Sequence, residues 1–209
     1  MRYRELGNTG LKVSEIGLGA EWLERHNGEE VKEIIDCCES LGINILDCWM
    51  SEPNVRSNIG KAIAGKREKW IIQGHFGSTW QDGQYVRSRE MGKVKEAFAD
   101  LLARLGTDYI DFGMVHCIDE LSDLQQYCEG GALDYIQTLK KQGVVRHIGL
   151  SSHTPAVVHA MLDTGLIDVV MFSINPAYDY QKGSYGIGSV EDRLALYQRC
   201  EKEQVGITV

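Results

Sequence analysis

Short apolar runs rich in β-branched residues alternate with longer segments of helical periodicity along most of the 209-residue chain. Apolar side chains recur every three or four residues in a helix, whereas a buried strand shows a short continuous apolar run. The runs expected as strands are 15–18, 44–47, 70–73, 109–112, 147–150, 169–172 and 205–209. The segments expected as helices are 29–41, 55–64, 88–105, 131–142, 155–164 and 190–203. This alternation predicts a parallel sheet whose strands are joined by right-handed crossover helices.

Two parallel architectures fit this order of elements: an open doubly wound sheet and a closed β/α barrel. The first strand–helix turn, residues 17–22, lacks a GxGxxG pattern, and no GxxxxGK[ST] pattern occurs in the chain. In both patterns, backbone amides and a helix N-terminus hold phosphates, so their absence disfavours the open nucleotide-binding folds. We therefore predict an α/β fold of the (β/α)8 TIM-barrel type, preceded by a β-hairpin in residues 3–13 whose Gly/Asn-rich centre suits a tight turn.

The strand count and the chain length both fall short of a complete barrel. Seven strands are expected after the hairpin, and 209 residues is fewer than the ~250 typical of a barrel with eight β/α units. No linker rich in Pro, Gly or Ser divides the chain. We expect a single domain over residues 1–209, an incomplete barrel of about seven β/α units that is truncated at its C-terminal end.

Composition narrows the classes of partner. The 30 Asp and Glu residues outnumber the 22 Lys and Arg residues, and the net charge of −8 disfavours a broad nucleic-acid surface, which needs basic residues to neutralise phosphates. No apolar run approaches the ~20 residues that span a bilayer, and residues 1–5 are too polar for a secretory signal. Six cysteines without a CxxC pair are typical of reduced thiols. We expect a cytoplasmic protein with a small-molecule substrate.

Four polar side chains lie where a β/α barrel carries its active site, at the carboxyl ends of strands and in the loops that follow. Asp47 follows the second predicted strand, His75 the third and His116 the fourth, and Glu52 lies five residues beyond Asp47. Carboxylates and imidazoles are the usual general acids and bases. A structural role competes at each position, and Glu52, directly before Pro53, is also suited to capping a helix.

Four segments of the chain resemble the aldo-keto reductase family. They are residues 3–14 with Gly17-Leu18-Gly19, residues 42–44 leading to Asp47, residues 104–111 leading to His116, and residues 145–151. The similarity runs in order from residue 3 to residue 209. Residues 171–179 resemble a bacterial branch whose longer members end in a cysteine-rich, ferredoxin-like tail. The resemblance implies reduction of carbonyls with NADP(H) and, in a tail outside this chain, a [4Fe–4S] cluster.

The resemblance also implies which residues are catalytic. The family uses an Asp, Tyr, Lys and His tetrad, in which the tyrosine protonates the carbonyl oxygen and the lysine, paired with the aspartate, lowers the pKa of the tyrosine. Asp47 and His116 match the aspartate and the histidine, whereas Glu52 stands at the tyrosine position and His75 at the lysine position. We expect an NAD(P)H-dependent oxidoreductase with this altered tetrad, in which Glu52 or His75 donates the proton, His116 orients the carbonyl and Asp47 pairs with His75.

The cofactor positions implied by the resemblance are mixed. Ser151 matches the serine that holds the nicotinamide carboxamide, Ser152 stands in place of the asparagine that follows it, and Met171 stands in place of a glutamine on strand six. The family's stacking aromatic and its 2′-phosphate contacts come after strands seven and eight, beyond the strands expected in this chain. Two alternatives stay open: a non-catalytic barrel scaffold and a metal-dependent barrel enzyme that binds Zn²⁺, Mn²⁺ or Fe²⁺ with Asp47, Glu52, His75 and His116.

Overall fold

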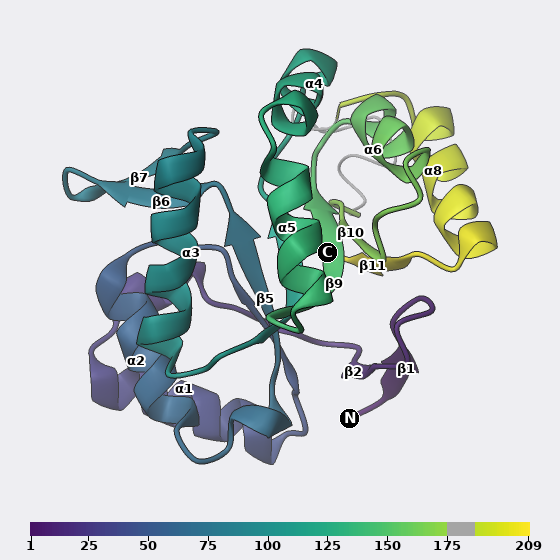
Figure 1. Cartoon of the computed structure of the whole chain (residues 1–209). Helices are drawn as coiled ribbons and strands as arrows, with labels where there is room; N and C mark the ends of the chain where they lie inside the picture. Colours follow the sequence, from purple (N-terminus) through teal and green to yellow (C-terminus); the bar gives the residue numbers. More distant parts are fainter. Residues whose placement is uncertain (175–186) are drawn as a thin grey trace.

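A parallel sheet of seven strands forms the centre of the molecule, with helices packed on its outer face (Figure 1). In the computed structural model, which describes residues 1–174 and 187–209, the strand order is β11-β10-β9-β8-β5-β4-β3. The strands are β3 (Leu18–Gly19), β4 (Ile45–Cys48), β5 (Ile71–Phe76), β8 (Ile110–Val115), β9 (Val145–Ser151), β10 (Val169–Met171) and β11 (Gly206–Thr208). In the described residues the edge strands β3 and β11 do not pair with each other, so the sheet is an incomplete barrel, as predicted.

The helices follow from local sequence signals. They are α1 (Gly28–Ser40), α2 (Pro53–Ile63), α3 (Met91–Leu105), α4 (Leu121–Glu129), α5 (Ala132–Lys141), α6 (Pro155–Leu162) and α8 (Val190–Glu203), with short 3-10 turns at Glu21–Arg25 and Arg67–Lys69. Asn27 caps α1 in a capping box with Glu30, and Ser189 caps α8 in the same way with Asp192. Gly106, at φ +64°, ends α3 in the left-handed conformation that favours glycine. No helix among the described residues is long and apolar enough to cross a membrane.

Each strand separates two apolar layers, because successive side chains point to opposite faces. Leu46 belongs to the larger cluster beneath the helices, whereas its neighbour Ile45 packs on the concave side with Phe112 and Val169. The predicted N-terminal hairpin, β1 (Tyr3–Glu5) with β2 (Lys12–Ser14), contributes Leu6 and Val13 to that concave cluster. The hairpin thus closes the amino-terminal end of the sheet.

Two elements of the structure were absent from the sequence-based expectation. Residues 78–87, expected as a loop leading into a long helix, form a second hairpin of β6 (Ser78–Gln81) and β7 (Gln84–Arg87). Its two-residue turn, Asp82-Gly83, has positive φ at both positions, and an Asp-Gly pair is a strong hairpin signal. Helix α4 was also missed, and the first strand is shorter and later than predicted. Residues 175–179 of the run that resembles the ferredoxin-tailed branch lie outside the described residues.

Candidate functional site

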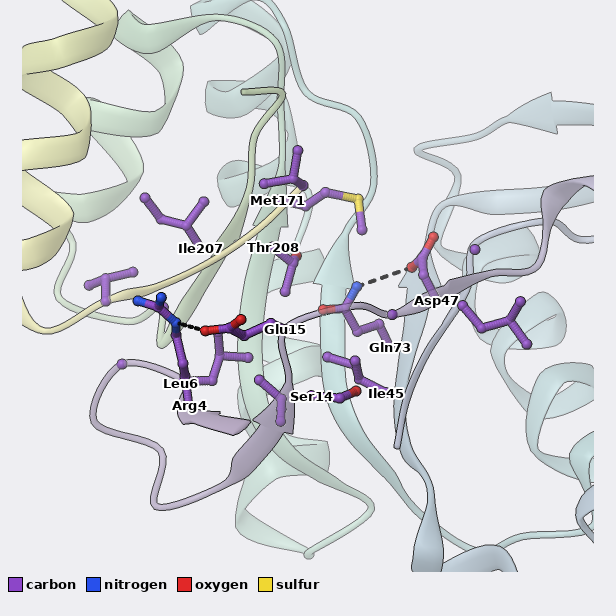
Figure 2. Close-up of a pocket in the computed structure, with 18 of the residues that line it drawn as sticks. Arg4, Leu6, Ser14, Glu15, Ile45, Asp47, Gln73, Met171, Ile207 and Thr208 are labelled. Atoms are coloured by element: carbon purple, nitrogen blue, oxygen red, sulfur yellow. Dashed lines mark hydrogen bonds and ion pairs between the residues drawn. The ribbon is translucent and has the colours of Figure 1, made fainter. Parts of the chain in front are cut away.

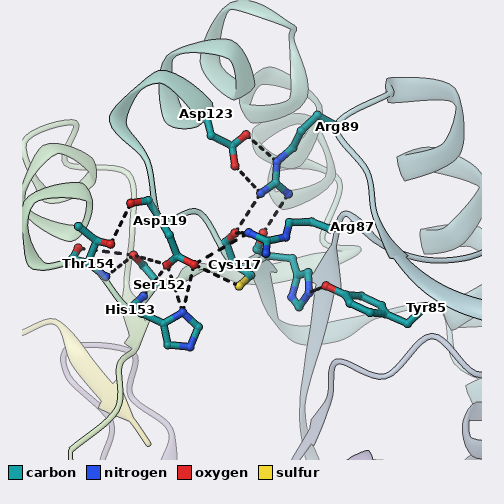
Figure 3. A network of polar contacts seen from close by, with 10 residues as sticks. Tyr85, Arg87, Arg89, Cys117, Asp119, Asp123, Ser152, His153 and Thr154 are labelled. Atoms are coloured by element: carbon teal, nitrogen blue, oxygen red, sulfur yellow. Dashed lines mark hydrogen bonds and ion pairs between the residues drawn. The ribbon is translucent and has the colours of Figure 1, made fainter. Parts of the chain in front are cut away.

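A chain of hydrogen bonds joins four side chains at the carboxyl end of the sheet. Asp47 Oδ1 lies 2.9 Å from His75 Nε2, and His75 Nδ1 lies 2.9 Å from His116 Nδ1. His116 Nε2 in turn lies 2.7 Å from the hydroxyl of Tyr85, and Figure 3 shows this end of the chain. Strands β4, β5 and β8 are parallel neighbours, so the first three residues meet at one sheet edge, and the β6–β7 hairpin brings the fourth. We call these residues the polar relay.

The hydrogen-bond partners restrict the protonation states within the polar relay. Asp47 Oδ1 accepts a hydrogen bond from Gln73 Nε2 at 3.2 Å as well as from His75 Nε2, as expected of a carboxylate. Burial, and then the nearby charge on His75, hold the pKa of His116 well below its usual value, so this imidazole is neutral at neutral pH. One ring nitrogen of the histidine pair therefore donates to the other. Burial also raises the pKa of Tyr85, which keeps its phenol protonated.

The two ends of the polar relay are accessible, whereas its middle is not. The His75 side chain is 1% exposed and His116 is 5% exposed, but the Asp47 side chain is 16% exposed and Tyr85 is half-buried. Trp49 covers the middle: its ring stacks on the His116 imidazole at 5.7 Å and meets the edge of Tyr85 at 5.1 Å. The relay is therefore accessible from outside at Asp47 and at Tyr85.

Glu52 has a different environment from the other three tetrad positions. Its Oε2 accepts a hydrogen bond from the Val55 amide at 2.6 Å, which caps α2 in front of Pro53, and its Oε1 accepts from Asn54 Nδ2 at 3.0 Å. None of the hydrogen bonds in the described part of the chain joins Glu52 to the polar relay. The structure thus brings together three of the four predicted catalytic residues, and it adds Tyr85, whose sequence signal was the Asp-Gly turn of its hairpin.

The residues implied as nicotinamide contacts lie on or directly after adjoining strands, but they differ in exposure. Ser151 and Met171 are direct partners in the β9–β10 register. Ser152 is buried, and its hydroxyl accepts a hydrogen bond from the Thr154 amide at 3.1 Å and lies 3.5 Å from Asp119 Oδ1. Ser152 is therefore occupied by the loop that precedes α6, whereas Ser151 and Met171 are partly exposed.

A cavity of about 950 Å³ lies between the two edge strands of the sheet, and Figure 2 shows Asp47, Gln73, Met171 and Thr208 in its wall. Gln73 Oε1 and Thr208 Oγ1 are buried atoms with no hydrogen-bond partner in the described structure. Such atoms suit the N–H groups of a carboxamide. Arg4 is the one basic residue among the described cavity-lining residues, and it pairs with Glu15. The cavity thus offers two unpaired acceptor atoms and a single basic side chain among its described lining residues.

A second polar cluster lies beside the relay, where Cys117, Asp119 and His153 place their ligand atoms within 4.8 Å of one another (Figure 3). Asp119 accepts a hydrogen bond from His153 Nδ1 at 3.1 Å, and Arg87 Nη1 lies 3.9 Å away. Although burial acts to raise it, the contacts with His153 lower the pKa of Asp119 to about 2, and Asp119 raises the pKa of His153 to about 10. Because an imidazolium and a guanidinium already balance the carboxylate, we interpret this cluster as an ion pair.

The four residues of the metal-site alternative do not form a comparable group of ligand atoms. Among the described residues, the cluster around Asp119 is the one set of three or more His, Cys, Asp or Glu residues close enough to hold an ion. In the polar relay, the nitrogen and oxygen atoms that would bind a metal instead form hydrogen bonds with one another. This hydrogen-bonded arrangement is suited to proton transfer.

Comparison with known protein sequences identifies related oxidoreductases. The sequence profile of the Aldo/keto reductase family matches residues 15–179. An uncharacterised oxidoreductase of Bacillus subtilis is 31% identical over 179 residues, which are 84% of this chain and 56% of that protein. The chain spans about half the length of the curated relatives it matches.

Solved structures share the fold. The holo form of an aldo-keto reductase from Bacillus halodurans superposes with a TM-score of 0.81 at 26% identity, covering 100% of this chain and 65% of that one. An aldo-keto reductase from Klebsiella pneumoniae in complex with NADPH superposes with a TM-score of 0.72 at 16% identity, covering 99% and 67%. These similarities confirm the predicted barrel-type α/β fold.

Proposed function

The chain belongs to the aldo/keto reductase family, and from this membership we propose that the protein is an oxidoreductase that uses NADP(H) to reduce a carbonyl or related small-molecule substrate. The observation that carries the proposal is the convergence of Asp47, His75 and His116 into one hydrogen-bonded set. These residues stand at three of the four positions of the family's tetrad. A set of this kind supplies and relays a proton, which reduction of a carbonyl requires at its oxygen atom.

His75 has the role that the resemblance gives to the missing lysine. Its Nε2 donates to the Asp47 carboxylate, so the imidazolium form of His75 is paired with a negative charge as a lysine would be. A histidine takes up and releases a proton near neutral pH, which a lysine with an ordinary pKa does not. We infer that the altered tetrad carries out acid–base chemistry through His75, that His116 connects His75 to the substrate side, and that Glu52 serves chiefly as the cap of α2.

The nicotinamide cofactor supplies the hydride when it is bound. We propose that Ser151 and Met171 contact the nicotinamide side, with Ser152 positioning the loop beside them. The cavity next to Asp47, with its unpaired Gln73 and Thr208 atoms, supports this assignment. A [4Fe–4S] cluster in a C-terminal tail is a separate expectation, tested by visible absorption of the protein after anaerobic reconstitution.

Residues 1–209 are proposed to act as one domain in the cytoplasm. The six cysteines are all free in the structure, which supports a reducing compartment. The proposed partner is a small-molecule substrate, and the net charge of −8 disfavours a nucleic-acid partner.

The test of this function measures NADPH binding by fluorescence and NADPH oxidation with a panel of aldehydes, ketones and enones. We expect saturable binding, turnover with at least one carbonyl, and a large loss of turnover in Asp47→Asn. The matched control is Asp163→Asn, which removes an exposed carboxylate paired with Arg199 and is expected to retain turnover. An absence of saturable NADPH binding would refute the proposal and favour the scaffold alternative, whereas a stoichiometric bound metal would favour the metal-dependent one.

A further inference from the structure

We propose that Tyr85, carried by the β6–β7 hairpin, is the terminal proton donor of the polar relay and protonates the substrate oxygen. This inference rests on the proposed reductase function, and it assigns to Tyr85 the role that position 52 has in the family. The assignment comes from the 2.7 Å contact between the Tyr85 hydroxyl and His116 Nε2.

Accessibility selects Tyr85 among the members of the relay. A proton donor must touch the substrate, but the imidazoles of His75 and His116 are both buried, and Trp49 stacks on that of His116. Asp47 is partly exposed, yet its Oδ1 accepts hydrogen bonds from both Gln73 and His75, so this oxygen is already occupied as an acceptor. Of the two accessible ends of the relay, half-buried Tyr85 is the one that carries a donor hydrogen.

Hydrogen bonds from buried serine hydroxyl groups hold the β6–β7 hairpin beside the polar relay. Ser51 donates a hydrogen bond to the Thr79 carbonyl at 2.7 Å, and Ser78 donates to the Trp49 carbonyl at 2.6 Å. Both serines are buried, and both bonds tie the hairpin to the loop after β4 that carries Trp49. At the other end, Arg87 Nη1 donates to the Cys117 carbonyl, directly after His116. Tyr85 is therefore held in place on two sides.

The geometry permits a balanced proton transfer. The proposed transfer starts with a proton on each ring nitrogen of His75, donated from Nε2 to Asp47 and from Nδ1 to His116 Nδ1, while neutral His116 donates from Nε2 to the Tyr85 oxygen. The Tyr85 O–H bond breaks as an O–H bond forms on the substrate, whose carbon receives the electron pair as the cofactor's hydride. The phenolate then takes the Nε2 proton of His116, and His116 Nδ1 takes the Nδ1 proton of His75.

At the end of this sequence Tyr85 is again a phenol, His116 is again neutral and His75 has lost one proton. His116 changes tautomer without becoming charged, which agrees with the buried environment that disfavours its imidazolium form. The relay is reset from the Tyr85 end after product leaves: the Tyr85 oxygen takes a proton from solvent as its own proton passes to His116 Nε2, and the Nδ1 proton of His116 returns to His75 Nδ1. The relay thus consumes one proton for each carbonyl reduced.

The experiment compares Tyr85→Phe with Tyr135→Phe in the purified protein. Tyr135 is a partly buried tyrosine on α5 whose ring packs against Phe76. Its variant therefore controls for the loss of a tyrosine hydroxyl at a similar depth. We expect Tyr85→Phe to lower kcat by about 10²–10⁴-fold, the usual range for loss of a general acid, with an unchanged Kd for NADPH. Tyr135→Phe is expected to keep kcat within a factor of about two. Wild-type turnover in Tyr85→Phe overturns the inference.

A second readout is independent of turnover. Nitrogen-15 NMR of the six histidines reports ring tautomers, and removal of the Tyr85 hydroxyl is expected to shift the signals of both His116 and His75, while Tyr135→Phe leaves them unchanged. Unshifted His116 and His75 signals in Tyr85→Phe refute the relay even if kcat falls. If the wild-type protein binds no NADPH, the proposed function fails, and the histidine spectra still decide whether Tyr85 is coupled to His75.

Discussion

Replacement of Asp111 by asparagine is expected to destabilise the barrel strongly, because this carboxylate ties three strands together at the amino-terminal end of the sheet. Asp111 Oδ2 accepts from Arg67 Nη2 at 3.1 Å and from the Ile72 amide at 2.9 Å, and Oδ1 accepts from Arg146 Nη1 at 2.9 Å. The Asp111 side chain is 3% exposed and that of Arg67 is 13% exposed. The variant keeps the shape of the side chain but leaves Arg67 without its counter-charge.

The size of the effect follows from these exposures. Loss of one partner of a buried ion pair costs about 3–5 kcal/mol, and hydrogen bonds to charged groups contribute about 1.5–3 kcal/mol each. Arg146 is half exposed, so its bond adds little, and Arg67 keeps its bond to the Tyr109 carbonyl. We therefore expect Asp111→Asn to lower the free energy of unfolding by about 3 kcal/mol.

Urea unfolding at pH 7, followed by circular dichroism, measures this difference. Asp108→Asn is the matched control, since Asp108 is exposed three residues away, and its effect is expected to stay within about 0.5 kcal/mol. In a double-mutant cycle, Asp111→Asn combined with Arg67→Gln should cost less than the sum of the single changes. A destabilisation by Asp111→Asn of less than about 1 kcal/mol would show that the buried pair does not hold the strands as argued.

Three further predictions concern the site and its surroundings. Glu52→Ala removes the cap of α2 and is expected to lower the free energy of unfolding in urea by about 0.5–2 kcal/mol; an unchanged stability contradicts the capping role. Gly77→Ala places a Cβ 2.8 Å from the Ser88 carbonyl oxygen at a backbone φ of +99°. We expect the free energy of unfolding to fall by about 1–3 kcal/mol and turnover to fall because the β6–β7 hairpin shifts. Wild-type stability and turnover in this variant would contradict the expectation. The pKa of His153 in the folded protein is raised from 6.5 to about 10, so its contribution to stability is full below about pH 6.5 and is lost as the pH rises through 10. The difference in unfolding free energy between wild type and His153→Gln should therefore shrink over that range. A difference that does not change with pH would contradict the ion pair.

Much of the fold was predictable because its signals are local. The capping box at Asn27, the glycine that ends α3 and the apolar runs of β4, β5 and β8 each depend on neighbouring residues, and each element lies close to its predicted position. The β6–β7 hairpin was missed although its Asp-Gly turn is also a local signal. Its strands are short and partly polar, and they pair with each other outside the main sheet. The alternation of strands and helices along the chain therefore does not predict them.

The sequence by itself determined the family and the barrel-type fold, because these depend on residue order along parallel strands, and it led to the proposal that Glu52 and His75 replace two tetrad residues. The tertiary structure alone decided which polar groups meet. It directs Glu52 to the amide of Val55, within three residues, and it brings Tyr85 to His116 across 31 positions of sequence. The physical reason is that the hairpin's orientation is set by buried hydrogen bonds from Ser51 and Ser78 to the chain around Trp49 and Thr79, contacts that no spacing in the sequence encodes.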